Sequence, residues 1–287
     1  RGGVSVPRGF SISGDFYEVF IGDSRIQPLI RRLEQEEDLE EIMRCANEIA
    51  SSVEEYDLPE ELKTCIGDAK NTLEEKYETG RLGYAVRSSA TIEDGKSFSF
   101  AGQAESCLCV MNKDKLIDSV KRVWQSTLTP RALLYLQSKK VPLSQVRMSV
   151  MIQDMVPADA AGVLFTTNVA TSDTSQILIE AVRGLGEPLV SGRVTPDTYI
   201  VDRESSELLE QHLGEMESML QAGPEGARLV EVPNHLRGIP VLDEDTIGAI
   251  GREGVRIESL MGCPQDIEWS LQKDSIVVLQ SRPITTM

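Results

Sequence analysis

The sequence predicts an α+β fold, with helices concentrated in the first half of the chain and antiparallel strands in the second. Apolar residues recur at helical spacing over residues 25–54 and again from Pro59 onward. Beyond residue 160, short apolar runs with strand periodicity alternate with turn-forming segments, which is typical of antiparallel sheets. The sequence contains no internal repeat of solenoid period, so a repeat protein is excluded.

The first half is expected to be mainly helical, because its apolar residues follow a period of 3.6 over long stretches. Proline and glycine interrupt this pattern and mark the expected ends of the elements. The expected elements are an extended piece from Val4 to Ile12 among the turn residues of 1–24, helices over 25–54 and from 59, a strand over 82–87, a helical stretch over 113–139 broken at Thr129-Pro130, and a strand that alternates over 146–152.

The second half is expected to be rich in strands. Val156-Pro157 marks the boundary between two lobes, so residues 1–157 form a helix-rich N-terminal lobe and residues 158–287 a strand-rich C-terminal lobe. Glycine and proline punctuate residues 214–240, which predicts a loop or lid. The expected elements are strands over 162–166, 177–182, 198–202, 266–271 and 275–280, and one helix over 243–261.

The chain is strongly acidic, with 29 basic and 46 acidic residues and a net charge of −17. Residues 31–78 contribute 16 acids and 6 bases, which predicts solvated helix faces. This charge excludes general binding of nucleic acid or of an anionic membrane surface, because phosphates would be repelled. The sequence has no apolar run long enough to span a membrane, and its five cysteines form no CxxC pair. We therefore expect a cytoplasmic protein with free thiols.

A hairpin over residues 266–282 contains the main candidates for metal and phosphate binding. Side chains alternate along a strand, so Asp266 and Glu268 share one face. With a three-residue turn centred on Asp274, Glu268 opposes Gln280 on the next strand. By the same register, Asp266 opposes Arg282. Carboxylate and amide oxygens suit Mg²⁺, and Arg282 would neutralise a phosphate or hold Asp266. The alternative is a surface hairpin with a cross-strand ion pair.

Two further segments have the composition of phosphate-binding loops. Arg87 ends a strand and precedes Ser88-Ser89-Ala90-Thr91 and Ser99-Phe100-Ala101-Gly102-Gln103, in which backbone amides and a guanidinium can hold phosphate oxygens. Arg183-Gly184-Leu185-Gly186-Glu187 follows another strand, without the spacing of a dinucleotide-binding loop. An ordinary turn is the alternative for each segment. Cys107-x-Cys109 is interpreted as part of a core strand and not as a metal site.

Eight short motifs follow one another along nearly the whole chain. They are Val4-x-Val6-Pro7-x-Gly9-Phe10, Arg87-Ser88-Ser89-Ala90-Thr91-x-Glu93-Asp94, Ser99-Phe100-Ala101-Gly102-Gln103, Ala161-Gly162-Val163-Leu164-Phe165-Thr166, Gly184-Leu185-Gly186-Glu187, Val190-Ser191-Gly192-x-Val194-Thr195-Pro196-Asp197, Pro264-Gln265-Asp266-Ile267-Glu268-Trp269 and Gln280-Ser281-Arg282-Pro283. In this order they resemble the N-terminal nucleotide-binding domain shared by phosphoenolpyruvate synthase, pyruvate phosphate dikinase and rifampicin phosphotransferase.

The resemblance implies a two-lobed ATP-grasp architecture with antiparallel sheets, in which ATP and Mg²⁺ occupy a cleft between the lobes. It implies dikinase chemistry: the β-phosphoryl group of ATP passes to a histidine, AMP is released, and the γ-phosphate leaves as Pi or is passed to phosphate. Arg87 and Arg282 would act on the phosphates as catalytic residues. The cofactor-binding residues that it implies are Arg87, Gly102, Ser106, Cys107, Gln153 near the base, Glu268, Gln280 and Arg282; the implied metal ligands are Glu268 and Gln280, with Asp266 nearby.

The resemblance also implies partners. The family's phosphohistidine domain carries a Thr/Ser-His motif in a glycine-rich context, and neither His212 nor His235 has one. That domain and the acceptor-substrate domain are therefore expected elsewhere in the same full-length chain, or on a separate subunit as in phenylphosphate synthase-like systems. The acceptor, such as pyruvate, phenol or a rifamycin, would dock on those domains.

The sequence departs from the family pattern at a few positions. The family's Gly-Gly-Lys motif would precede Arg1, Met216 aligns with a usual lysine, Val169 replaces a proline, and Gly95-Lys96 replaces Leu-Pro. Three hypotheses therefore remain: the ATP half-reaction of a phosphoenolpyruvate synthase-like dikinase, or of a split phenylphosphate synthase-like or rifampicin phosphotransferase-like system; a catalytically impaired nucleotide-binding module; and an ATP-grasp ligase that releases ADP.

Overall fold

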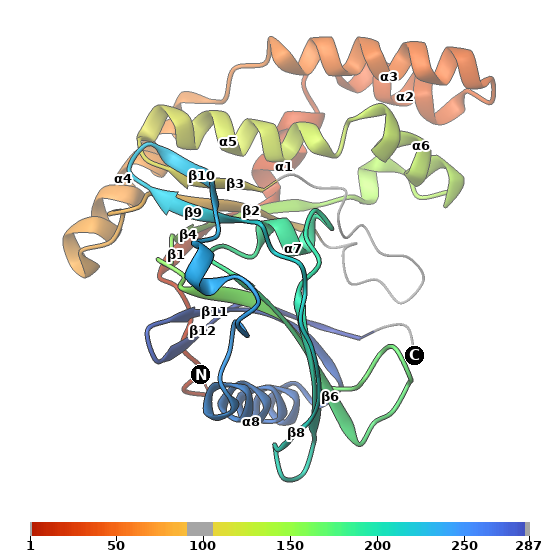
Figure 1. The fold of residues 1–287 in the computed structure, drawn as a ribbon. Coiled ribbons are helices and arrows are strands. Elements are labelled where there is room, and N and C mark those ends of the chain that lie inside the picture. Colours follow the sequence, from red (N-terminus) through yellow and green to blue (C-terminus); the bar gives the residue numbers. More distant parts are fainter. Residues whose placement is uncertain (1, 91–105, 285–287) are drawn as a thin grey trace. The chain divides into compact units, whose positions relative to one another are not determined.

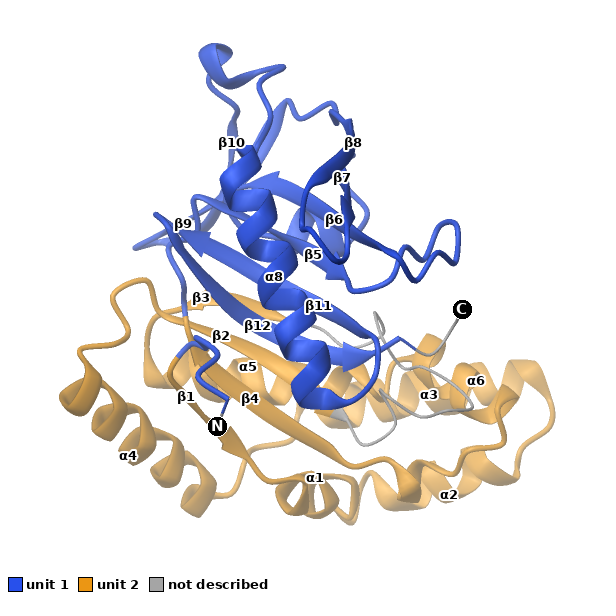
Figure 2. Ribbon diagram, turned by 90° about the horizontal axis from the view of Figure 1, so that it is seen from below, with its two compact units in different colours: residues 1–7, 155–287 blue, residues 8–154 orange. Residues whose placement is uncertain are grey.

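The computed structural model describes residues 2–90 and 106–284, and the chain divides into two compact units (Figures 1 and 2). The helical unit comprises residues 8–154, and the sheet unit comprises residues 1–7 and 155–287. The sequence placed the lobe boundary after residue 157. The compact units differ from those lobes in that residues 1–7 and 155–157 belong to the sheet unit.

The helical unit consists of a four-stranded antiparallel sheet in the order β1-β4-β2-β3, with helices packed against it around one core. Tyr17, Phe20 and Trp124 are fully buried and form ring contacts within this core. Its elements are β1 (Gly9–Ile12), α1 (Gly14–Ile21), α2 (Gln27–Gln35), α3 (Leu39–Glu54), α4 (Glu60–Tyr77), β2 (Tyr84–Ala90), β3 (Cys107–Val110), α5 (Lys113–Ser126), α6 (Pro130–Ser138), the 3-10 helix η1 (Leu143–Gln145) and β4 (Met148–Asp154).

The helices of this unit differ from the sequence prediction in two places. The sequence predicts one helix over 25–54, but Glu36 is extended and ends α2, and the Asp38 side chain caps a new helix, α3. The sequence predicts turns over 14–21, but these residues form α1, which Ser13 caps. Only the tertiary structure supplies the core against which this short helix packs.

The sheet unit consists of a six-stranded antiparallel sheet in the order β12-β11-β5-β6-β7-β8. Helix α8 covers one face of this sheet (Figure 2). Asp243 caps the start of α8, and Gly262 ends it in a left-handed conformation. The elements are β5 (Ala160–Phe165), β6 (Gln176–Arg183), α7 (Glu187–Val190), β7 (Asp197–Asp202), β8 (Leu208–His212), β9 (Ser218–Gly223), β10 (Gly226–Glu231), the 3-10 helix η2 (Asn234–Leu236), α8 (Glu244–Met261), β11 (Gln265–Gln272) and β12 (Ser275–Pro283).

The fold class predicted from the sequence, an α+β domain with antiparallel sheets, is confirmed. The segment 214–240, however, is not simply a loop, because β9 and β10 pair as a separate two-stranded hairpin. Gly223 pairs with Gly226, so Pro224 and Glu225 form the tight turn of this hairpin. Residues 88–90 likewise continue strand β2, where the sequence suggested a turn.

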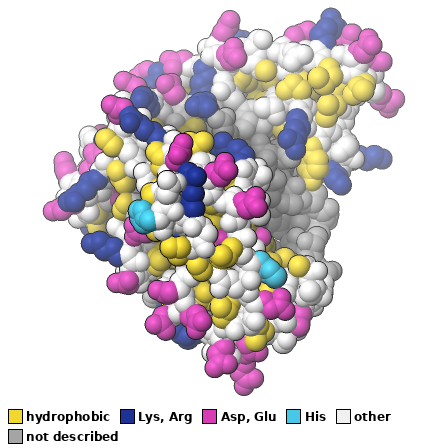
Figure 3. Space-filling view, viewed as in Figure 1, with side chains coloured by type: hydrophobic (Ala, Val, Ile, Leu, Met, Phe, Trp, Pro, Cys, Tyr) yellow, Lys and Arg dark blue, Asp and Glu magenta, His cyan; other side chains and the backbone are white. Residues whose placement is uncertain are grey.

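The acidic segment 31–78 lies on α2, α3 and α4 and the connections between them, and none of its acidic side chains is buried. Arg32 forms ion pairs with Glu41 at 3.0 Å and Glu48 at 3.3 Å across α2 and α3. On the face seen in Figure 3, acidic and basic side chains are interspersed. The acidity of this segment is thus a property of exposed helix faces, as the sequence predicted. Within residues 2–90 and 106–284, no helix combines the length and apolar character needed to cross a membrane.

Candidate nucleotide-binding site

The hairpin β11–β12 brings together the pairs of side chains that the sequence predicted. Asp266 lies opposite Arg282, and Glu268 lies opposite Gln280. The predicted turn, however, is wrong. Gln272 pairs with Ser275, so the turn has two residues rather than three. A β-bulge restores the expected register, because the pairing shifts by one between Glu268 and Trp269.

The bulge decides which face of the sheet receives the predicted ligand Gln280. Trp269 pairs with Val278, and both contribute to the core beneath α8. Glu268 precedes Trp269 and therefore points to the opposite face. Leu279 is the extra residue between Val278 and Gln280, so Gln280 joins Glu268 on the face away from α8. We call this the open face of the sheet unit. Without the extra residue, Gln280 and Val278 would share a face.

Arg282 and Asp266 form a close ion pair on this open face. The Arg282 Nε donates to Asp266 Oδ2 at 2.8 Å, and Nη2 lies 2.7 Å from the same oxygen. The Asp266 side chain is 11% exposed and that of Arg282 is 34% exposed. A charge-assisted pair in this partly buried setting fixes the guanidinium relative to the strand. Of the two roles suggested for Arg282, the structure shows the one in which it holds Asp266.

A third carboxylate, Glu180 of β6, shares the open face and was missed by the sequence analysis. Val163 of β5 pairs with Glu268 on one side and with Glu180 on the other, so the two glutamates belong to one row across three strands. Burial, and then the charge of Asp266, raise the pKa of Glu180. A single charged residue in the apolar run Ile177–Val182 was the signal that could have revealed it.

Two motif residues of the sequence hold this row in place. Gly162 of β5 pairs with Trp269 of β11, and the Trp269 ring lies against the glycine. A Cβ at position 162 would lie 2.5 Å from Cζ2 of Trp269 and would overlap the carbonyl oxygen of Glu180. Trp269 is 1% exposed. The close approach of three strands therefore requires glycine at this position.

Asp197, the last residue of the Thr195-Pro196-Asp197 motif, has a structural role. Its carboxylate is 1% exposed and accepts hydrogen bonds from Gly214 N at 2.8 Å, Val241 N at 2.8 Å and the Tyr199 hydroxyl at 3.1 Å. Two segments distant in the sequence are thereby tied to strand β7. Arg183 acts similarly, since its guanidinium donates to the carbonyl oxygens of Ile239 at 2.8 Å and Pro240 at 3.1 Å.

In the helical unit, Arg87 and Gln153 lie on the same face of the sheet. Val86 and Ile152 pair with one another, are fully buried, and face the helices. Their neighbours Arg87 and Gln153 therefore point to the other face, and both are partly exposed. Arg87 pairs with Met151, so Arg87 and Gln153 are diagonal neighbours across β2 and β4. The structure thus brings together two residues that are 66 positions apart in the sequence.

The remaining predicted nucleotide-binding residues of this unit fall around β3. Ser106 is exposed and directly precedes the strand. The side chain of Cys107 is 9% exposed and belongs to the helical core, so only the backbone of Cys107 remains a candidate for contact with a nucleotide. Cys109 is also buried, in agreement with the interpretation of this pair as core. Gly102 lies outside the described residues.

The donor set of the open face fits Mg²⁺ only in part. In the described portion of the chain, no group of three or more His, Cys, Asp or Glu side chains is arranged to hold a metal ion. Glu268 and Gln280 offer one carboxylate and one amide oxygen from paired positions. Mg²⁺ is commonly bound by one or two carboxylates together with phosphates of the substrate. The residues present therefore fit a metal ion that arrives with a nucleotide.

The helices and antiparallel sheets of the two units are those of an α+β domain of the ATP-grasp type. Comparison with known proteins then identifies its family: residues 1–287 match the family described as pyruvate phosphate dikinase, AMP/ATP-binding domain, and the chain belongs to it. The resemblance seen in the sequence motifs is thereby confirmed.

Several curated proteins are similar to all or most of this chain. A probable phosphoenolpyruvate synthase of Methanothermobacter thermautotrophicus is 38% identical over 292 residues, which cover 100% of this chain and 42% of that protein. Rifampicin phosphotransferase of Bacillus cereus is 36% identical over 293 residues, covering 99% of this chain and 32% of that protein. Phosphoenolpyruvate synthase of Pyrococcus furiosus is 39% identical over 248 residues, covering 83% and 30%. The chain thus spans less than half the length of these relatives.

Proposed function

We propose that this chain binds Mg·ATP and performs the ATP half-reaction of a phosphoenolpyruvate synthase-like dikinase. The observation that carries the proposal is the bulge-dependent pairing of Glu268 with Gln280, next to the Asp266–Arg282 ion pair, within a domain of this ATP-binding family. Oxygen ligands and a fixed guanidinium at neighbouring positions are what transfer of a phosphoryl group requires, since catalysis there is mainly positioning and charge neutralisation.

In the proposed reaction a nitrogen of a histidine on another domain or subunit attacks the β-phosphorus of ATP. The N–P bond forms as the bond from the β-phosphorus to the oxygen bridging it to the α-phosphorus breaks, and AMP leaves. The γ-phosphate is released to water as Pi, so one ATP, one water and one histidine yield AMP, Pi and phosphohistidine. The histidine domain and the acceptor-substrate domain are proposed to lie in the same full-length chain, since the relatives are much longer than this chain, or on a separate subunit.

Each candidate residue has a proposed role in this half-reaction. Arg87 holds the phosphates, Gln153 contacts the base, and the backbone near Ser106 and Cys107 approaches the phosphate chain together with Gly102. Asp266 orients Arg282 toward the phosphates through the ion pair. Glu268 and Gln280 would hold Mg²⁺, which would supply neutralisation of phosphate charge when bound.

Product identity tests the proposal directly. The full-length protein that contains this chain, incubated with Mg²⁺ and [β-³²P]ATP, should form labelled phosphohistidine and AMP. A catalytically impaired nucleotide-binding module would bind Mg·ATP without turnover, and an ATP-grasp ligase would release ADP. Either result would overturn the dikinase proposal. A rifampicin phosphotransferase-like or phenylphosphate synthase-like protein would also give AMP, and would differ only in the final acceptor.

The variant Glu268→Gln tests the metal site within this reaction. It keeps the size of the side chain and removes the charge, so AMP formation at saturating ATP should fall by roughly 100-fold or more. Asp274→Asn is the matched control, because it removes one carboxylate from the exposed turn of the same hairpin. Equal activity of the two variants would remove Glu268 from the proposed site.

A further inference from the structure

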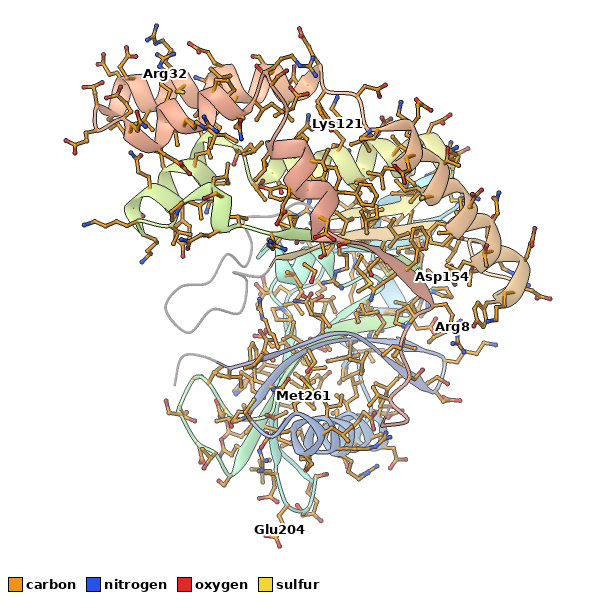
Figure 4. The ribbon with its side chains drawn as sticks, turned by 180° about the vertical axis from the view of Figure 1, so that it is seen from behind. Arg8, Arg32, Lys121, Asp154, Glu204 and Met261 are labelled. Atoms are coloured by element: carbon orange, nitrogen blue, oxygen red, sulfur yellow. The ribbon has the colours of Figure 1, made fainter. Side chains whose placement is uncertain are left out.

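The chain passes between the two compact units twice, and the two passages are neighbours. One lies between Pro7 and Arg8, and the other between Asp154 and Met155. Strands β1 and β4 pair up to Gly9 and Gln153, and Asp154 N then donates to the Arg8 carbonyl oxygen at 2.7 Å. Figure 4 shows Arg8 and Asp154 near one another at the end of this strand pair. The backbone at both passages is thus a short two-stranded ribbon.

The Asp154 side chain is held by the connection that follows α4. Its Oδ1 accepts a hydrogen bond from Gly80 N at 2.7 Å. Gly80 has φ of +82°, and a Cβ there would lie 2.5 Å from Glu74 Oε1 and 3.0 Å from the Tyr84 hydroxyl. This backbone position therefore suits glycine alone, and its N–H is presented to Asp154 from a tightly packed turn.

That turn is itself anchored on regular structure. Glu74 of α4 forms an ion pair with Lys70 at 2.7 Å and accepts a hydrogen bond from the Tyr84 hydroxyl at 3.1 Å. Tyr84 is fully buried at the start of β2. Because a helix and a strand fix these side chains, the turn that carries Gly80 has a defined place beside Asp154.

The second passage is contacted from the same side. The Arg8 guanidinium lies 4.5 Å from the ring centroid of Tyr77, the last residue of α4, which is a cation–π contact. The end of α4 and the turn after it therefore contact both strands at the points where the chain leaves the helical unit. We call Tyr77 and Gly80 the brace.

We propose that the brace makes Arg8 and Asp154 positioning residues for the nucleotide base: by holding both strands where they leave the helical unit, it fixes the backbone of the adjacent Gln153. The proposal rests on the proposed function, in which Gln153 contacts the base of ATP. Gln153 pairs with Gly9 of β1 and with Ala85 of β2, so strands on both sides fix its backbone. The next residue, Asp154, is the one that accepts the hydrogen bond from Gly80 of the brace.

The proposal is tested with variants that differ only in the brace contact. Asp154→Ala removes the acceptor of the Gly80 N–H, whereas Asp154→Asn keeps an oxygen at that place and should behave as the wild type. Tyr77→Leu removes the ring that contacts the Arg8 guanidinium. Tyr77 is 40% exposed, so this substitution leaves the core intact. Glu75→Ala, an exposed carboxylate of the same helix, is the matched control.

Two ligands of the full-length protein separate positioning of the base from general damage. Mg·ATP should bind about tenfold more weakly to Asp154→Ala and several-fold more weakly to Tyr77→Leu. The reason is that a displacement of Gln153 by about 1 Å would weaken its contact with the base. Mg·tripolyphosphate, which lacks the base, should bind all variants equally. A uniform loss for both ligands, or no loss of ATP affinity in either variant, would overturn the proposal.

Hydrogen–deuterium exchange without nucleotide tests the brace independently of the proposed function. Amides at 152–156 should exchange faster in Asp154→Ala and Tyr77→Leu than in Asp154→Asn, Glu75→Ala or the wild type. Unchanged exchange would refute the brace even if ATP binds normally. Failure of the wild type to bind Mg·ATP would instead refute the proposed function, while faster exchange would still confirm that the brace holds this backbone. Should Asp154→Ala fold poorly, Tyr77→Leu decides both measurements.

Discussion

Substitution of Gly162 by alanine tests whether close approach of β5, β6 and β11 holds the open face together. The added methyl group would overlap the Glu180 carbonyl oxygen and lie 2.5 Å from the Trp269 ring. One obstacle is backbone of a central strand, and the other is a ring that is 1% exposed. Neither can move aside by a simple change of rotamer, so the strands must separate or the ring must leave its place beneath α8.

The expected change in the free energy of unfolding is the sum of two opposing effects. Overpacking of a tight site lowers the free energy of unfolding by about 1–3 kcal/mol. Alanine also restricts the unfolded chain, which raises the free energy of unfolding by about 0.4–1 kcal/mol. Because one obstacle is backbone, we expect a cost near the top of the overpacking range and a net loss of about 2 kcal/mol. At about 2–4 °C per kcal/mol for a chain of this size, Tm should fall by roughly 4–8 °C.

The assay is urea unfolding followed by tryptophan fluorescence, with calorimetry for Tm. Gly223→Ala is the matched control, because it makes the same change in strand β9 of the same unit, where the nearest atom to the new Cβ is Gly226 O at an ordinary 3.4 Å. Its stability should stay within about 0.5 kcal/mol of the wild type. If Gly162→Ala is as stable as Gly223→Ala, the interpretation of this strand contact is wrong.

Two further variants test the polar groups of the sheet unit. Asp197→Ala should lower the free energy of unfolding by about 2–3 kcal/mol, because it leaves the buried Tyr199 hydroxyl and two partly buried backbone N–H groups without their acceptor, at roughly 1 kcal/mol each. Chemical denaturation measures this loss, and a loss no larger than that of an exposed Asp274→Ala variant would contradict it. Glu180→Gln should stabilise the metal-free protein at neutral pH, because burial and the charge of Asp266 raise the pKa of Glu180 in the folded state. The folded state then holds its proton more tightly than the unfolded state, so the advantage of the variant should disappear as the pH falls through the raised pKa, and a difference in urea midpoint that persists at about pH 4 would refute this assignment.

The hairpin shows how far sequence reasoning reaches and where it stops. Alternation of side chains correctly paired Glu268 with Gln280, but the expected three-residue turn was wrong, and the bulge at Leu279 compensated for it. A bulge cannot be recognised from the sequence pattern of a short strand. One extra residue exchanges the inward-facing and outward-facing positions, and it does so only for the residues that follow it. The core beneath α8 selects it, since Val278 must pack with Trp269 while Gln280 points away from that core.

Other differences have the same origin. Helix α1 is too short for its periodicity to predict it, and it is stable because Tyr17 and Phe20 enter the core of the helical unit. Glu180 was passed over because an apolar strand surrounds it in the sequence, and only the pairing of three strands places it in the row of Glu268. Local patterns carry no information about which distant strand is the neighbour.

The sequence by itself determined the fold class, most helices and strands, the family and the identity of the main polar residues, because periodicity and short motifs are local properties of the chain. The tertiary structure decided which face each of these residues occupies, that the Asp197 carboxylate is buried and holds backbone groups, and that the end of α4 and the turn after it contact Arg8 and Asp154. Those properties depend on packing between segments far apart in the chain, where burial and steric fit select one register among several that the local pattern allows.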